Sequence, residues 1–205
     1  MAKEIKFKLA ELFCGPGGLA LGAMRSVIKK SDTTYGIEPI WANDIDPDTC
    51  KTYAKNIHGG ANKDVVCAPV QDIDFKKVPK FDALAVSFPC NDFSVVGKQK
   101  GFDGKYGPLY SHGLRAINTH NPQWFIAENV SGLQSANNGE AFKKILEDLE
   151  SRCAALFWME LYPINIVLPD RRDKFYTIIG PRRYYPLILR DDMIGAGKVH
   201  HLSIT

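Results

Sequence analysis

The stretch LFCGPGGLALG, residues 12–22, places three glycines between an apolar segment and a helical pattern. Residues 6–13 predict a strand, and the spacing of apolar side chains over residues 19–30 predicts a helix. Gly15, Gly17 and Gly18 allow a sharp turn between the two elements and a close approach of a ligand to the main chain. The spacing is GxGG rather than the full dinucleotide pattern GxGxxG, so a tight turn without a ligand stays an alternative.

The order of strand and then helix recurs along the chain. Further strands are expected at residues 39–43, 65–70, 83–87 and 124–128, and further helices at residues 47–56, 109–119 and 140–153. Residues 156–167 and 174–180 predict two strands joined by a polar turn, and therefore a hairpin. This pattern favours an α/β fold with a doubly wound, mostly parallel sheet and a C-terminal antiparallel hairpin.

Length and composition indicate an ordinary globular protein. The chain has 205 residues, of which 45% are hydrophobic and 24% charged, and its net charge of +3 is too small to identify a polyanion-binding protein. No apolar run approaches the ~20 residues that cross a bilayer, and the charged start of the chain does not resemble a signal peptide. Five widely spaced cysteines form no CxxC pair and no zinc-ligand spacing. We expect a cytoplasmic protein with reduced cysteines and no metal.

Carboxylates follow the predicted strands, where ligands of parallel sheets bind. In WANDIDPD, residues 41–48, Asp44 is placed to accept hydrogen bonds from both hydroxyls of a ribose. Asp46 is the second candidate for this role, and helix capping before Pro47 is the alternative for both residues, which we expect of Asp46. Asp72, after the third strand, is placed to bind an adenine amino group. Together with the glycine turn, these residues indicate an adenosyl cofactor, either a dinucleotide or S-adenosylmethionine.

In SFPCNDFS, residues 87–94, a proline and a cysteine directly follow a buried strand. Proline fixes its own backbone and pushes the preceding residue towards extended geometry, so Phe88-Pro89 forms a stiff exit. Cys90 would then be held at the edge of the sheet, where a thiolate can act as a nucleophile. A buried structural cysteine is the alternative.

The following segment, residues 95–107, interleaves glycines with lysines. Glycines favour mobility and lysines attract phosphate, so the segment is a candidate DNA-binding loop; a plain surface loop is the alternative. The candidate DNA contacts are Ser94, which directly precedes this segment, and Lys98, Lys100 and Lys105 within it.

Glu128 ends the fifth strand in WFIAENVSGL, residues 124–133, where partial burial would keep it protonated as an acid; a capping role is the alternative. A cysteine, an acid and a sulfonium cofactor suit methylation of carbon 5 of cytosine. That carbon becomes nucleophilic once a thiolate adds to carbon 6, and an acid at ring nitrogen 3 takes up the developing charge. The base must also be taken out of its stack, which suits a mobile basic loop.

Four motifs resemble those of the DNA cytosine-5 methyltransferases. They are FCGPGG at residues 13–18, FPCNDFSVVGKQKGF at 88–102, ENV at 128–130 and LPDRRDKFYTIIG at 168–180. The resemblance runs from about Leu9 to Gly180. It implies a Rossmann-like class I methyltransferase fold, S-adenosylmethionine as cofactor and methylation of double-stranded DNA of the restriction-modification type.

The resemblance also implies roles for individual residues. Cys90 is the nucleophile, Glu128 contacts the cytosine, Arg172 orients the base, and Lys174 stands in place of a second arginine and lacks its bidentate fork. The implied cofactor-binding residues are Phe13, Gly15, Gly17, Gly18, Asp44, Ile45, Asp72, Ile73 and Pro89. Among them, Phe13 would pack on the adenine, Asp72 and Ile73 would flank it, and Ile45 replaces a tryptophan common in the family.

Members of this family continue into a target-recognition region, a Gly-Asn-Ser-type motif and a closing helix, and residues 181–205 resemble none of these. We therefore expect a catalytic domain at residues 1–180 and a C-terminal extension at 181–205 that leads towards an absent recognition domain. Three explanations compete: a two-chain enzyme with a second polypeptide, a chain truncated to the catalytic half, and a degenerate remnant. The first is narrowly favoured.

Other functions stay open at this point. A non-catalytic module that binds cofactor or DNA and supports an active partner would retain the same pocket. An NAD-dependent oxidoreductase would use the glycine turn, but nothing near Cys90 supports hydride chemistry. An RNA substrate is also compatible, because the catalytic motifs do not distinguish the sugar.

Overall fold

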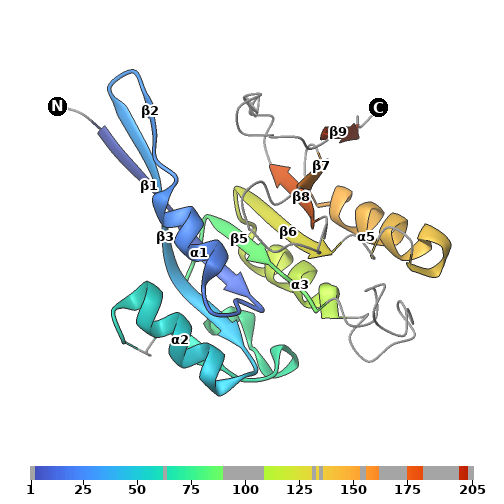
Figure 1. Cartoon of the computed structure of the whole chain (residues 1–205). Coiled ribbons are helices and arrows are strands. Elements are labelled where there is room, and N and C mark those ends of the chain that lie inside the picture. Colours follow the sequence, from blue (N-terminus) through green and yellow to red (C-terminus); the bar gives the residue numbers. More distant parts are fainter. Residues whose placement is uncertain are drawn as a thin grey trace, which may run out of the picture. The chain divides into compact units, whose positions relative to one another are not determined.

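The structure, a computed structural model, describes residues 3–61, 64–89, 109–130, 133, 136–152, 156–161, 175–181 and 199–202. The chain divides into two compact units. The first comprises Met1–Ser87 and Arg115–Gln123, and the second comprises Phe88–Leu114 and Trp124–Thr205. Figure 1 shows the helices and strands, coloured along the sequence.

A largely parallel sheet forms the centre of the first unit. Its strands are β1 (Lys3–Leu12), β2 (Ile28–Lys30), β3 (Thr33–Asp44), β4 (Val65–Cys67) and β5 (Ala83–Val86). β1 lies between β3 and β5 and is parallel to both, and β4 is parallel to β3. Leu9, Ala10 and Leu12 are at most 1% exposed, as expected for a parallel strand covered on both faces. Leu12 is paired with Asn43 and with Val86, so β1, β3 and β5 end at one edge of the sheet.

Two helices of the first unit each follow a strand of this sheet. α1 (Gly18–Arg25) follows β1, α2 (Pro47–His58) follows β3, and both pack against β3 (Figure 1). The predicted start of α2 is confirmed, because the Asp46 side chain accepts a hydrogen bond from the Thr49 backbone N–H and proline occupies the first turn. The helix ends at His58, and Gly59, whose φ of 61° is in the left-handed region, caps it.

The helix predicted over residues 19–30 was wrong in its second half. α1 ends at Arg25, and Ile28–Lys30 forms β2, which pairs antiparallel with the beginning of β3. The β-branched residues Val27 and Ile28 favour extended backbone, and Ser31 turns the chain with a φ of 51°. As a result β3 is longer than the predicted strand at residues 39–43.

The third predicted strand, residues 65–70, is also shorter than expected. β4 ends at Cys67, and two 3₁₀ helices follow it, η1 (Val70–Asp72) and η2 (Phe75–Lys77). Pro69 has no N–H group to donate to a neighbouring strand, which explains why the ladder does not continue.

Antiparallel strands dominate the second unit. Its elements are β6 (Trp124–Val130), η5 (Ala136–Gly139), α5 (Glu140–Glu150), β7 (Leu156–Leu161), β8 (Phe175–Pro181) and β9 (Val199–Leu202). β8 is antiparallel to both β6 and β7, which confirms the predicted hairpin. β9 pairs with the other edge of β7 and was not predicted, because residues 181–205 show no periodicity.

One helix contributes to both units. α3 (Tyr110–His120) gives its first residues, up to Leu114, to the second unit and its last residues to the first. Within the second unit, the Tyr110 hydroxyl donates a hydrogen bond to the Asp148 carboxylate of α5 at 2.5 Å. Among the described residues, no helix is both long enough and apolar enough to cross a membrane.

Candidate functional site

The glycine loop between β1 and α1 has one packed side and one open side. At Gly17, whose φ is 95°, an added Cβ would lie 2.9 Å from Ile57 and 3.2 Å from Tyr53, both on α2. An added Cβ at Gly15 or Gly18 would meet no atom within 4 Å. The loop therefore rests directly on α2 at one glycine and leaves space for a ligand at the other two.

Asp44, the last residue of β3, connects the glycine loop to the end of that strand. Its Oδ2 atom accepts a hydrogen bond from the Gly15 N–H at 3.0 Å. Its Oδ1 atom accepts from the N–H groups of Ile45 at 2.8 Å and Asp46 at 3.1 Å. A carboxylate accepts about four hydrogen bonds, so roughly one acceptor position is left for a ligand. The structure thus gives Asp44 a bracing role that the sequence did not predict, and binding of ribose stays a prediction.

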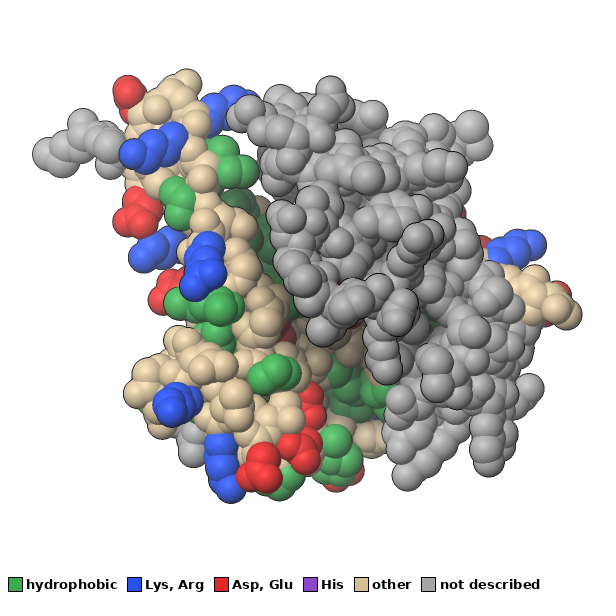
Figure 2. All heavy atoms as spheres, viewed as in Figure 1, with side chains coloured by type: hydrophobic (Ala, Val, Ile, Leu, Met, Phe, Trp, Pro, Cys, Tyr) green, Lys and Arg blue, Asp and Glu red, His purple; other side chains and the backbone are tan. Residues whose placement is uncertain are grey.

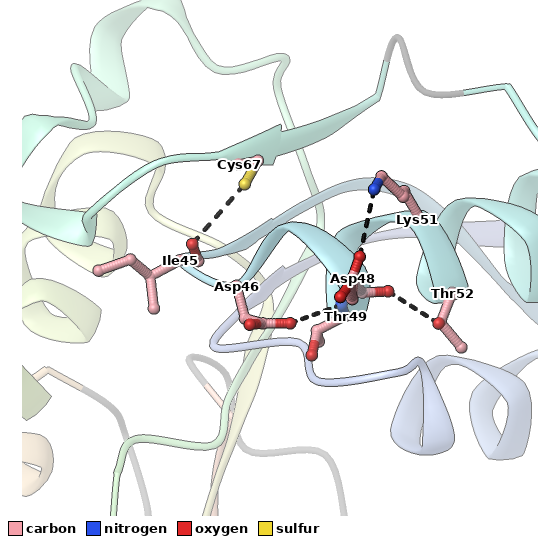
Figure 3. Close-up of polar contacts among 7 residues, drawn as sticks. All are labelled: Ile45, Asp46, Asp48, Thr49, Lys51, Thr52 and Cys67. Carbon is pink, nitrogen blue, oxygen red and sulfur yellow. Dashed lines mark hydrogen bonds and ion pairs between the residues drawn. The ribbon is translucent and has the colours of Figure 1, made fainter.

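Two apolar residues directly follow β1 and β3. Phe13 directly follows β1, is half-buried and has a φ of 56°, a left-handed conformation that is unusual for a bulky residue. Ile45 follows Asp44 and is 66% exposed. Figure 3 shows the Ile45 side chain pointing away from α2 and from Cys67. An exposed apolar side chain beside a bracing carboxylate suits the packing of a flat ring.

Asn43 connects the end of β3 to the next segment of the candidate pocket. Its side-chain amide donates to the carbonyl oxygens of Val66 at 2.9 Å and Ala68 at 2.8 Å. The chain then forms η1, which ends in the exposed residue Asp72, while Ile73 is only 7% exposed. Asp72 is therefore accessible to a ligand and Ile73 packs mainly in the core. The adenine contacts of both residues stay predictions.

Glu11 is a buried acid under the glycine loop that the sequence reading missed. It lies in β1 and is 2% exposed, and it accepts a hydrogen bond from the Tyr53 hydroxyl at 2.5 Å and another from the Ala20 backbone N–H. Burial raises the pKa of Glu11 to about 7, although both hydrogen bonds oppose the shift. The sequence does carry a signal for this buried acid, because a glutamate stands inside the apolar run directly before the glycine loop.

The described cysteines of the first unit differ in exposure. Cys14 and Cys50 are buried and Cys67 is exposed, and all three thiols are free. Burial raises the pKa of Cys14 above its ordinary range and raises that of Cys50 to about 12, so neither is a ready nucleophile at neutral pH. Among the residues that the structure describes, no group of three or more His, Cys, Asp or Glu side chains could hold a metal ion.

The second unit contains Pro89 and Glu128. Pro89 is half-buried and follows Phe88, whose carbonyl oxygen accepts a hydrogen bond from the Asn129 side-chain amide at 2.9 Å. Glu128 precedes Asn129 in β6, is half-buried and is paired in register with Thr177 of β8. The structure thus joins the start of the Pro-Cys segment to the Glu-Asn-Val segment.

Seven predicted site residues lie outside the described residues. They are Cys90, Arg172, Lys174, Ser94, Lys98, Lys100 and Lys105. Their roles stay predictions.

Exposed carboxylates lie on the two segments that follow β3 and β4 in the first unit. Asp46 and Asp48 at the start of α2 are exposed, as is Asp72 in η1, and only Asp48 has a described ion pair among them, with Lys51 at 3.1 Å. Figure 2 shows acidic side chains gathered at the lower edge of this unit. Such a surface repels phosphate, so this edge does not favour a polyanion.

The sequence matches a known family over most of its length. A family model described as C-5 cytosine-specific DNA methylase matches residues 7–183. The Type II methyltransferase M.BbvI of Brevibacillus brevis is 50% identical over 190 residues, which cover 87% of this chain and 50% of that protein. M.NgoFVII of Neisseria gonorrhoeae is 36% identical over 180 residues, which cover 86% of this chain and 44% of that protein. The chain thus spans about half the length of these curated relatives.

Solved structures agree on the fold. The Entamoeba histolytica methyltransferase EhMeth matches with a TM-score of 0.64 at 21% identity, covering 86% of this chain and 53% of that one. A putative DNA modification methyltransferase encoded within an E. coli prophage matches with a TM-score of 0.63 at 24% identity, covering 86% and 47%. These similarities confirm the predicted α/β methyltransferase fold.

Proposed function

The chain belongs to the C-5 cytosine-specific DNA methylase family, and from this premise we propose that it transfers a methyl group from S-adenosylmethionine to carbon 5 of cytosine in double-stranded DNA. Residues 1–180 would form the catalytic domain. The printed names of the relatives, which are Type II methyltransferases, support a role in restriction-modification.

The residues around the glycine loop fit such a cofactor. The loop has open space at Gly15 and Gly18, and the bracing carboxylate of Asp44 keeps one acceptor position for a ribose hydroxyl. Phe13 and Ile45 would pack on the adenine, and the exposed Asp72 would accept from its amino group. Gly17 would keep the loop on α2, and Ile73 would complete the pocket within the first unit, while the cofactor contact of Pro89 stays a prediction. When bound, S-adenosylmethionine supplies an electrophilic methyl group.

The chain supplies the groups that make the cytosine reactive. The Cys90 thiolate adds to carbon 6, which moves an electron pair towards carbon 5, and Glu128 donates a hydrogen bond at nitrogen 3 to stabilise the charge. Arg172 and Lys174 orient the ring. After carbon 5 has taken the methyl group, it loses its proton to a base, and the returning electron pair expels the thiolate.

The observation that carries this proposal is the hydrogen bond from Asn129 to the Phe88 carbonyl. Phe88 lies two residues before Cys90, and Asn129 directly follows Glu128. Both side chains are buried, at 4% and 3% exposure, so the bond is shielded from water. It supports a site in which nucleophile and acid are positioned together, because it anchors both motifs to one point of the second unit.

Contact with DNA is assigned to the segment after Cys90. Ser94, Lys98, Lys100 and Lys105 would bind phosphates while the target base leaves the stack. The exposed carboxylates near α2 would repel phosphates, so we do not expect DNA to bind at that edge of the first unit. Recognition of a DNA sequence by a second polypeptide stays a prediction that rests on the sequence motifs alone.

A methyl-transfer assay tests the function. The chain is incubated with labelled S-adenosylmethionine and DNA or RNA of the same sequence, alone and with the half of M.BbvI that this chain does not cover. We expect 5-methylcytosine in DNA with wild type and none with Cys90→Ser. Methylation of another atom, or equal activity of Cys90→Ser, would contradict the proposal. Cofactor binding without transfer under every condition would favour a non-catalytic module.

A further inference from the structure

Glu11 is a carboxyl group in a place where burial is costly. It lies between Ala10 and Leu12, which are at most 1% exposed, and is itself 2% exposed. A buried charge costs free energy unless it is hydrogen-bonded, so a carboxyl residue here requires a compensating role. Its hydrogen-bond donors belong to different helices: the Ala20 backbone N–H to α1 and the Tyr53 hydroxyl to α2.

The bond to Ala20 replaces a missing helix cap. The first N–H groups of a helix have no partner within the helix, and a polar residue at the N-cap position usually accepts from one of them. The N-cap residue of α1 is Gly17, which has no side chain to offer. Glu11 therefore supplies the acceptor from the neighbouring strand, and its negative charge suits the positive end of the helix dipole.

The hydrogen bond from Tyr53 also acts on the glycine loop, because the Tyr53 ring packs against it from α2. Tyr53 is 0% exposed, and its ring is one of the groups on which the backbone of Gly17 rests. Glu11 thus joins β1, α1 and α2 around the glycine loop.

We propose that Glu11 is a positioning residue for the cofactor: its carboxylate holds the glycine loop in the binding conformation and does so less well when protonated. This rests on the proposed function for the identity of the cofactor. Glu11 has no contact with the cofactor in this proposal, and acts only through the first turn of α1 and through Tyr53.

Several titratable groups lie near Glu11 and Tyr53, and they determine how the affinity for the cofactor depends on pH. Burial raises the pKa of Tyr53 and of Cys14, so both stay neutral near pH 7, while burial raises that of Glu11 to about 7. Asp44 acts on Cys14 from the end of β3, and the His58 ring lies 5.7 Å from the Tyr53 ring. Hydrogen bonds to an ionised acceptor are stronger than those to a neutral one. Affinity for the cofactor should therefore rise as Glu11 loses its proton.

Calorimetry with the full chain at pH 6 and pH 8 tests the coupling, with S-adenosylmethionine and S-adenosylhomocysteine as probes. Wild type should bind both about tenfold more tightly at pH 8, the size of one strengthened hydrogen bond. Glu11→Gln should abolish this dependence and Tyr53→Phe should reduce it, while the controls Glu4→Gln, on the same strand, and His58→Gln should keep it. A dependence confined to the sulfonium compound would show direct attraction of charge and overturn the positioning role, as would a dependence that Glu11→Gln retains.

Amide hydrogen exchange at pH 7.5 without cofactor gives a second readout. The Ala20 amide should exchange about tenfold faster in Glu11→Gln, and faster in Tyr53→Phe, while the Leu84 amide in β5 keeps its protection. Unchanged protection of Ala20 would overturn the proposal. If wild type binds neither probe at any pH, the proposed function fails, and the Ala20 amide still decides whether Glu11 holds α1.

Discussion

The side-chain amide of Asn129 donates a hydrogen bond to the backbone carbonyl oxygen of Phe88 at 2.9 Å. The two residues are 41 positions apart in the sequence, and both are buried. The bond fixes the main chain just before Pro89, where the rigid proline ring passes the constraint on to the next residue. In the proposed mechanism, this anchor determines where the sulfur of Cys90 is presented.

Replacing Asn129 with leucine should slow methyl transfer without weakening cofactor binding. The variant keeps the approximate volume but removes the donor, and losing the partner of a buried carbonyl costs about 1–3 kcal/mol. We expect a roughly tenfold to hundredfold lower single-turnover rate and an unchanged cofactor Kd by calorimetry. A variant that transfers methyl groups at the wild-type rate would remove the anchor from the mechanism.

Asp44→Asn should weaken cofactor binding more than tenfold and loosen the glycine loop. An amide has one acceptor oxygen, and its NH₂ group would face a backbone donor, either Gly15 on one side or Ile45 and Asp46 on the other. The matched control is Asp46→Ala, which loses the cap of α2 and hence some stability but keeps the affinity for the cofactor. Calorimetry of both variants checks this. Equal cofactor affinities for Asp44→Asn and wild type would contradict the proposed cofactor pocket around Asp44.

Two glycine variants separate packing from ligand space. Gly17→Ala should destabilise the fold by about 1–3 kcal/mol, because its Cβ would lie 2.9 Å from Ile57 on a backbone with a φ of 95°. Gly18→Ala should keep the Tm of wild type and bind S-adenosylmethionine more weakly, because its Cβ points into open space. Thermal unfolding and calorimetry give the two quantities. Wild-type affinity in Gly18→Ala would show that the cofactor does not use the open side of the loop.

Stability should fall between pH 5 and pH 8 because of Glu11. Its pKa is about 7 in the folded chain and near 4.5 ordinarily, so the folded state holds a proton that the unfolded state has lost. The contribution is therefore fully present below about pH 4.5 and disappears as the pH rises through about 7, a change on the order of 3 kcal/mol. Glu11→Gln should remove this part of the dependence in denaturant unfolding. A constant difference between variant and wild type at pH 5 and pH 8 would contradict the assignment.

Local patterns predicted the elements around the pocket well. The cap of α2 was expected from Asp46 followed by proline, and the structure has that hydrogen bond. The strand before the glycines and the C-terminal hairpin were expected from apolar runs and turn residues, and both are present. These features depend on residues close together in the sequence, which is why a single sequence was sufficient.

The remaining features depend on contacts between distant residues. The hydrogen bond from Tyr53 to Glu11 spans 42 positions, and nothing in either local pattern predicts it. The apolar spacing that suggested a helix through residue 30 continues into β2, where pairing with Tyr35 and Thr33 outweighs helix propensity. Asp44 was expected to face a ligand, but its hydrogen bond from the Gly15 N–H, 29 positions away, requires knowledge of where β1 ends beside β3.

Trapping of a covalent complex decides whether Cys90 attacks the base. In 5-fluorocytosine DNA the fluorine cannot leave as the proton does, so an enzyme that has added its sulfur to carbon 6 and transferred the methyl group stays attached. With S-adenosylmethionine and a recognition half present, the proposed mechanism predicts a peptide containing Cys90 that carries the methylated fluorocytosine, and no adduct in Cys90→Ser. An unmodified Cys90 under these conditions, or an adduct on another residue, would contradict it.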